Sequence, residues 1–119
     1  MENIREKANE WVKKATETRR KLKDEAYTIT EDIIKEYGKD EGKNIVIDLV
    51  EKDSTITVME YDDYEGDYVA RDIEKIELSK EYGGICLIYG EEDYDYIKYS
   101  NMLLFDRISL IDELMSIFS

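Results

Sequence analysis

The stretch EDIIKEYGKDEGKNIVIDLV, from Glu31 to Val50, contains the point at which the chain changes from helical to extended periodicity. Before Gly38, apolar residues recur every three or four positions, which is the spacing of one helical face. From Lys43 the residues become β-branched and apolar, as in a strand that is buried on much of both faces. Gly38 stands where the C-terminal cap of a helix belongs. The stretch therefore predicts a helix that ends at Gly38 and a sheet that follows it.

The helical pattern extends back from Gly38 to the start of the chain. Residues 1–37 contain no Pro or Gly, and their apolar or small residues alternate in steps of three and four. These residues are Ile4, Ala8, Trp11, Ala15, Thr18, Leu22, Ala26, Ile29, Ile33 and Tyr37. Thr28 and Glu31 have capping-box spacing, so the region forms either one long helix or two in series. Because Trp11 lies on the apolar stripe, we expect it in the core.

Residues 43–99 predict an antiparallel sheet of four or five strands, because the connections between the apolar runs are short. The expected strands are 44–50, 55–61, 68–78 and 84–90, with a short fifth strand within 93–99. Turns are expected at 52–54, 62–67, 79–84 and 90–94. The uneven apolar spacing within 68–78 predicts a β-bulge.

The chain ends in ISLIDELMSIF, Ile108 to Phe118, whose apolar residues have helical spacing. Ser109 followed by Asp112 suggests an N-terminal cap, and the predicted helix covers 106–118. The fold class is therefore α+β. A long N-terminal helix (or two in series) precedes an antiparallel meander of four or five strands and a C-terminal helix, all in one domain, 1–119.

The charge is strongly acidic and unevenly distributed. The chain of 119 residues has 17 basic and 30 acidic residues and a net charge of −13. The first 24 residues carry a net charge of +3, so the remainder carries −16. Such a charge argues against direct binding to nucleic acid or to an anionic membrane. A single cysteine, and the lack of a signal-peptide pattern or a membrane-length apolar run, predict a cytoplasmic protein in its own cell or in a host cell.

The acidic residues gather in two clusters with interleaved tyrosines. They are Glu60, Tyr61, Asp62, Asp63, Tyr64, Glu65, Asp67 and Tyr68 in the first cluster, and Glu91, Glu92, Asp93, Tyr94, Asp95 and Tyr96 in the second. In a simple meander alternate turns share one end of the sheet, which would bring the two clusters together on one rim. Acidic turns also occur merely as solvated surface that discourages strand-edge pairing. The tyrosines favour a binding surface, because Tyr supplies contact area at low entropic cost.

Catalysis is not expected, and neither is a cofactor or a bound metal. The chain has no histidine, which removes the commonest general base and the usual nucleophile pairs. Cys86 lies within a predicted apolar strand, as a structural thiol does. The run 62–67 lacks the ligand spacing of a calcium-binding loop.

The pattern predicts a protein that binds and blocks a basic partner, such as a nuclease or a CRISPR effector, by occupying its nucleic-acid-binding groove. In size and charge the chain is similar to DNA mimics and anti-CRISPR proteins of phages and mobile elements, a likeness of composition that covers no motif. One alternative is an immunity protein or antitoxin against a nuclease toxin. Another is an oligomeric assembly protein, such as a homodimer, that works through the N-terminal helix, whose heptad-like spacing from Ile4 to Leu22 allows helix pairing.

Overall fold

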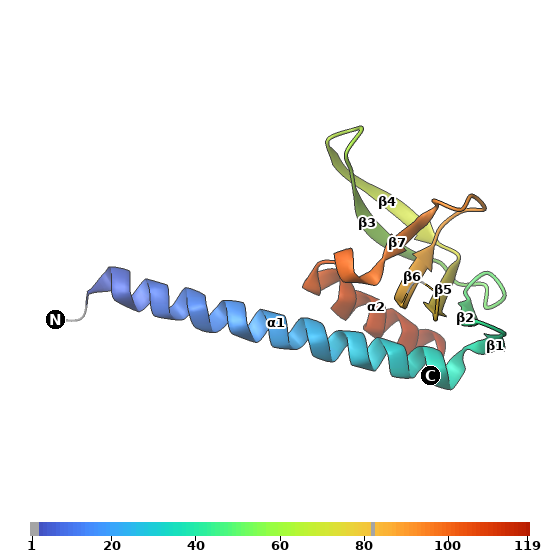
Figure 1. The fold of residues 1–119 in the computed structure, drawn as a ribbon, viewed down its shortest axis with the longest axis horizontal. Coiled ribbons are helices and arrows are strands. Elements are labelled where there is room, and N and C mark those ends of the chain that lie inside the picture. Colours follow the sequence, from blue (N-terminus) through green and yellow to red (C-terminus); the bar gives the residue numbers. More distant parts are fainter. Residues whose placement is uncertain (1–2, 82) are drawn as a thin grey trace.

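The computed structural model describes residues 3–81 and 83–119 and confirms the α+β class (Figure 1). The predictions for Met1, Glu2 and Tyr82 lie outside the described residues. A long N-terminal helix is followed by antiparallel strands and a C-terminal helix. Within the described part of the chain, no helix is both long enough and apolar enough to cross a membrane.

Helix α1, Ile4–Tyr37, is one continuous helix of 34 residues. The alternative of two helices in series is excluded, because the helix continues without a break through Thr28, whose hydroxyl donates back to the Asp24 carbonyl (3.3 Å). At its start, the Asn3 side chain accepts a hydrogen bond from the Arg5 amide (2.9 Å). At its end, the Gly38 amide donates to the Ile34 carbonyl (2.8 Å).

Gly38 is required by space rather than by an unusual backbone angle. Its φ of −80° is accessible to any residue. A Cβ atom at this position, however, would lie 2.5 Å from the Ile34 carbonyl oxygen and 2.8 Å from Ile45 Cγ2. The glycine therefore lets the chain turn from α1 directly against the first strands of the sheet.

The main sheet has five antiparallel strands in the order β1-β2-β5-β6-β7. Their bounds are Lys39–Glu41 (β1), Asn44–Asp48 (β2), Lys75–Ser79 (β5), Gly84–Ile88 (β6) and Tyr96–Lys98 (β7). β1 lies between the predicted helix and the first predicted strand and was not predicted. The short fifth strand predicted within 93–99 is present as β7.

The predicted second strand and most of the third leave this sheet. Strands β3, Ile56–Asp62, and β4, Asp67–Ile73, pair with each other as a separate two-stranded sheet. At Glu74 the chain passes from β4 into β5, and Glu74 is already bonded to the main sheet through its amide, which donates to the Ile88 carbonyl (2.8 Å). The uneven apolar spacing read as a bulge therefore arises from a change of sheet. We refer to the β3–β4 hairpin, residues 56–73, as the arm.

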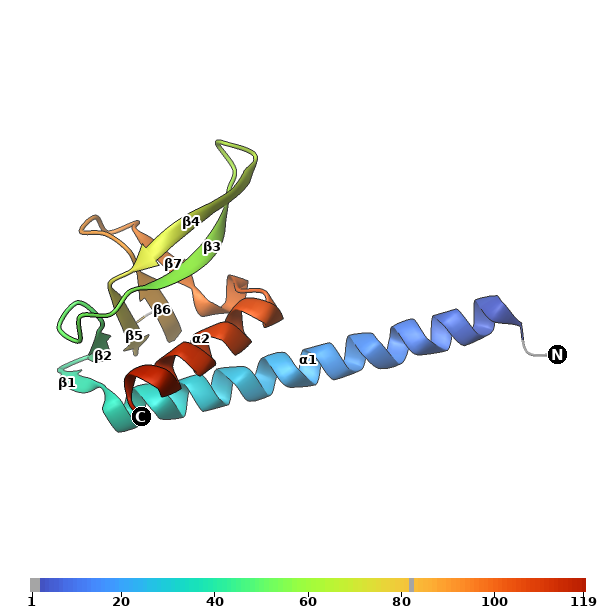
Figure 2. The same cartoon turned by 180° about the vertical axis from the view of Figure 1, so that it is seen from behind.

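Helices α1 and α2, Leu104–Ile117, lie side by side on one face of the main sheet (Figures 1 and 2). They run in the same direction, because Arg107 contacts Lys23 near the start of α2 and Phe118 stacks on Tyr37 at its end. The base of the arm closes the core beside α2. The fully buried apolar side chains include Ile34, Leu49, Ile56, Ile73, Ile76, Leu87, Leu110 and Leu114.

The predicted C-terminal helix is present, but its predicted cap is wrong. Helix α2 begins at Leu104, and its N-cap residue Leu103 makes no side-chain capping bond. Ser109 lies inside the helix. A short 3-10 turn, η1, Tyr99–Asn101, precedes α2 and carries the chain into it from β7.

The N-terminal part of α1 projects far beyond the rest of the molecule (Figures 1 and 2). The buried residues of α1 begin only at Ala26, and the molecule extends 61 Å along its longest axis. Trp11 is 69% exposed, so its predicted core position is wrong. The spacing correctly placed Trp11 on an apolar stripe, but this part of the stripe has no sheet to pack against. We refer to residues 4–22 as the projecting segment.

Candidate protein-binding surface

The first acidic cluster lies on the outer half of the arm. Tyr61 and Tyr68 are directly paired across the two strands, and their rings meet edge to face with centroids 5.3 Å apart. Both rings are about half exposed. Beyond them Gly66, with a φ of 70°, allows the chain to reverse. Tyr64 lies in this turn and is 98% exposed.

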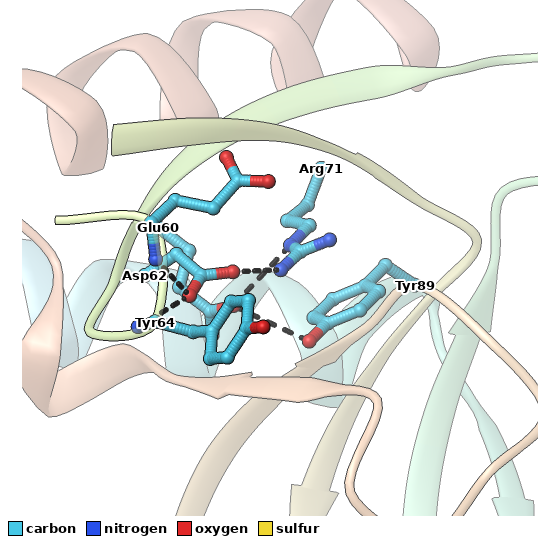
Figure 3. A network of polar contacts seen from close by, with 6 residues as sticks. Glu60, Asp62, Tyr64, Arg71 and Tyr89 are labelled. Atoms are coloured by element: carbon cyan, nitrogen blue, oxygen red, sulfur yellow. Dashed lines mark hydrogen bonds and ion pairs between the residues drawn. The ribbon is translucent and has the colours of Figure 1, made fainter. Parts of the chain in front are cut away.

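Arg71 joins two of the predicted site carboxylates to the rest of the molecule (Figure 3). Its guanidinium donates to Glu60 Oε1 (3.3 Å) and to Asp62 Oδ2 (3.4 Å), and it lies 4.8 Å from the centre of the Tyr89 ring. The Tyr89 hydroxyl donates to the same Glu60 oxygen at 3.3 Å. Burial raises the pKa of Tyr89, and the nearby Glu60 carboxylate raises it further.

Glu60 and Asp62 therefore hold the arm in place rather than presenting unpaired charge. Asp62 Oδ1 also accepts hydrogen bonds from the amides of Tyr64 (2.9 Å) and Glu65 (3.2 Å), which fixes the turn at the tip. The exposed residues of this cluster are Tyr61, Asp63, Tyr64, Glu65, Asp67 and Tyr68.

The second cluster forms a compact loop, residues 90–95, between β6 and β7; we refer to it as the acidic loop. The Tyr89 amide donates to the Asp95 carbonyl (2.9 Å), and the Asp95 amide donates to the Glu92 carbonyl (3.0 Å). Asp95 Oδ2 accepts a further bond from the Glu92 amide (3.3 Å). Tyr94 is 74% exposed at the outside of this loop. Glu91, Glu92 and Asp93 are exposed as well.

A pocket of about 250 Å³ lies between the acidic loop and the face of the sheet that the helices leave uncovered. Its walls include Glu77, Cys86 and Tyr96 from the strands together with the carboxylates of the loop. Burial raises the pKa of Glu77, Lys75 opposes this, and Glu41 adds to it. A positively charged side chain that entered this pocket would be attracted by several carboxylates at once.

The two clusters share one end of the molecule, but they do not form a single rim. Both the arm and the acidic loop leave the main sheet at the same end. At this end the residues paired across adjacent strands are Asp48, Lys75, Ile88 and Tyr96. Both project away from the helices, but their tips point apart (Figures 1 and 2). The predicted approach at strand spacing is wrong, because β3 and β4 lie outside the main sheet. The arm and the segment leading into the loop instead meet where Tyr89 contacts Glu60 and Arg71.

Sequence reasoning missed Arg71 and Tyr89, which brace this surface. A signal for Arg71 was present, since it is the only basic residue between Lys52 and Lys75. A lone base in so acidic a stretch is surrounded by partners. Tyr89 carried no comparable signal, because its contact with the arm depends on the way the arm folds back.

Among the described residues, no group of three or more His, Cys, Asp or Glu side chains is placed to hold a metal ion. Cys86 is buried, as predicted, and burial, together with the nearby Glu77, raises the pKa of its thiol. A raised pKa keeps the thiol protonated and unreactive near neutral pH.

Comparison with known proteins assigns no family, since no protein-family model, curated protein or solved structure matches the chain.

Proposed function

We propose that this protein is a non-catalytic inhibitor that binds the basic, nucleic-acid-binding groove of another protein through the arm and the acidic loop. One observation carries the proposal. Tyr64 stands 98% exposed at the tip of a projecting arm, with the exposed carboxylates of Asp63 and Glu65 on either side. A turn that served only solubility would not need an aromatic ring so fully in water.

The chemistry of this surface corresponds to what a nucleic acid offers a protein. Carboxylates supply negative charge for Lys and Arg, as phosphates do. Exposed tyrosine rings supply flat apolar surface, as bases do for the proteins that stack on them. The pocket beneath the acidic loop would receive a basic side chain of the partner. We place the protein in the cytosol, of its own cell or of a host, where such partners act.

The proposal is tested by using the immobilised protein as bait in a lysate of its source organism or host. We expect it to capture a basic nucleic-acid-binding protein and to release that protein when duplex DNA is added. DNA competes in this way only if both ligands use the same groove. Capture that added DNA does not disturb, or the absence of any captured basic protein, would overturn the proposal.

The contact surface is tested with two charge-matched double variants, each of which changes the net charge from −13 to −9. Asp63→Lys with Glu92→Lys alters one exposed acid in each cluster. Glu36→Lys with Glu81→Lys alters two exposed acids away from both clusters, one near the end of α1 and one in the turn between β5 and β6. We expect the first pair to weaken binding to the captured protein by about tenfold or more, and the second by less than about threefold. Equal weakening by both pairs would mean that overall charge, not this surface, determines binding.

A further inference from the structure

The projecting segment carries an apolar stripe that remains open to water. Ile4 is 77%, Trp11 69% and Leu22 42% exposed. A helix that extends about 28 Å beyond its own core is marginal in water without a covering surface. A tryptophan on such a stripe is also the residue type that most often dominates an interface.

The order of residues along the stripe indicates what covers it. Steps of four and three place Ile4, Trp11 and Thr18 at one heptad position and Ala8, Ala15 and Leu22 at the other. In an antiparallel pair of identical helices these two positions face each other. The facing pairs are then Ile4 with Leu22, Trp11 with Ala15, and Ala8 with Thr18.

This register is self-complementary. The residue numbers of each facing pair have the same sum, so the three pairs occur together around one twofold axis. The bulky Trp11 of each copy meets the small Ala15 of the other, which allows the helices to approach closely. A parallel pair would instead place Trp11 against Trp11 and Ala15 against Ala15, leaving one layer overfilled and the next underfilled.

Charge favours the same orientation. The first 24 residues carry +3 and the remainder carries −16. We refer to the acidic remainder of the chain, residues 25–119, as the body. An antiparallel pair keeps the two acidic bodies at opposite ends of the dimer, and it directs the basic N-terminal segment of each copy toward the acidic body of the other. A parallel pair would place the two acidic bodies side by side.

The body offers a place for the end of the incoming helix. Where α1 meets the start of α2, a hollow of about 390 Å³ is lined by Trp11, Ala15, Leu22 and Leu104, among others. The antiparallel register brings Ile4 of the second copy to Leu22, at the edge of this hollow. The line of contact between the two projecting segments, the seam, would therefore end on an apolar surface.

We infer that two copies of this chain form an antiparallel homodimer through the projecting segments, with Trp11 of each copy packed on Ala15 of the other. The inference rests on α1 and does not depend on the function proposed for the arm and the acidic loop. Because the interface is a single short seam, the dimer dissociates on dilution.

The dimer is tested by sedimentation equilibrium over a wide range of protein concentration. We expect the mass to rise from the monomer value of 14.1 kDa to twice that value. Trp11→Ala and Leu22→Ala should each weaken the dimer by about tenfold or more, although alanine is the stronger helix former. Tyr94→Ala, which removes an equally exposed aromatic ring elsewhere, should leave the dimer unchanged. A folded protein that stays monomeric at every concentration, or a dimer that both stripe variants retain, would overturn the inference.

The antiparallel orientation of the two helices is tested by disulfide formation between chains that each carry one introduced cysteine. The native Cys86 is buried and serves as the background control. Mixed Ile4→Cys and Leu22→Cys chains should form the mixed disulfide in preference to either symmetric one, because the antiparallel register makes these positions opposite each other. Rapid symmetric disulfides of Ile4→Cys alone would show parallel pairing and contradict the register.

Discussion

Arg107 joins α1, η1 and α2 at a single buried point. Its guanidinium donates to the backbone carbonyls of Lys23 (3.0 Å), Ser100 (3.3 Å) and Met102 (3.2 Å). It also lies 4.6 Å from the centre of the Tyr99 ring. Carbonyl dipoles and an aromatic face thus replace the water that this cation loses on burial.

Tyr99→Phe tests the polar side of this junction. The Tyr99 hydroxyl lies 2.9 Å from the Thr30 hydroxyl, and both groups are buried. Thr30 also donates to the Ala26 carbonyl (2.8 Å), so it keeps one partner in the variant. We expect a loss of about 1 kcal/mol in the free energy of unfolding at neutral pH, measured by urea denaturation with far-ultraviolet circular dichroism.

The same variant should also change how the free energy of unfolding depends on pH. Burial raises the pKa of Tyr99, even though the Thr30 hydrogen bond and Arg107 lower it. A raised pKa in the folded state means that the stability contributed by the neutral phenol is fully present below about pH 10 and is lost as the pH rises through the folded value. The wild-type protein should therefore lose more stability than Tyr99→Phe in this alkaline range. Parallel profiles for the two proteins would contradict the assignment.

The arm owes its position to a few polar contacts rather than to a large core. Val58 and Ile73 are buried near its base, but Glu60, Asp62 and Arg71 occupy the next positions along the same face. The outer half of the arm is thus held by the network around Arg71 and by the turn at its tip.

Arg71→Met should release the outer half of the arm. The variant keeps an unbranched apolar side chain but removes the guanidinium, whose positive charge neutralises the two carboxylates and which contacts the Tyr89 ring. We expect a loss of about 1–2 kcal/mol and faster amide hydrogen exchange in residues 59–70, with little change in β5 and β6. Lys75→Met, which removes an exposed positive charge at the sheet end, is the control. Unchanged exchange in the arm would show that the network does not hold it.

The sequence predicted both helices and most of the strands, but it did not predict β1, the separation of β4 from β5, or the sheet to which each strand belongs. Periodicity separates α1 and α2 from the strands, and Gly38 marks the boundary. The passage from β4 to β5 at Glu74 contains no Gly, Pro or Asn that would indicate a break in the strand. Whether a strand belongs to the main sheet or to the arm depends on which of its residues reach the core, and the local sequence pattern does not encode this. For the same reason the sequence located both acidic clusters but not the contacts between them.

The projecting segment dominates the shape of the protein. The radius of gyration is 17.1 Å, compared with about 13.5 Å expected for a compact chain of this length. The stripe of α1 looks uniform in sequence, yet only its C-terminal part has a core to cover. The sequence therefore placed Trp11 correctly on the apolar stripe, but it could not show that this part of the stripe is exposed.

A chain that begins at Lys21 should therefore fold with nearly the stability of the full chain. Among the described residues 3–20 the deletion removes none that is buried, and it keeps the Lys23 carbonyl that accepts from Arg107. We expect the free energy of unfolding to fall by less than about 1 kcal/mol, mainly through loss of the Asn3 cap. The comparison is made by urea denaturation at a concentration low enough for both chains to be monomeric. A larger loss would show that the projecting segment packs on the body.

The position of Trp11 also determines what optical spectroscopy can report. It is the only tryptophan, and it lies in the projecting segment, whereas all ten tyrosines follow residue 26. Tryptophan emission therefore reports on the projecting segment of α1 and changes little when the body unfolds. Tyrosine emission reports on the body and changes little when the projecting segment unfolds. Each chain thus carries two kinds of intrinsic fluorophore, which report separately on the projecting segment and on the rest of the molecule.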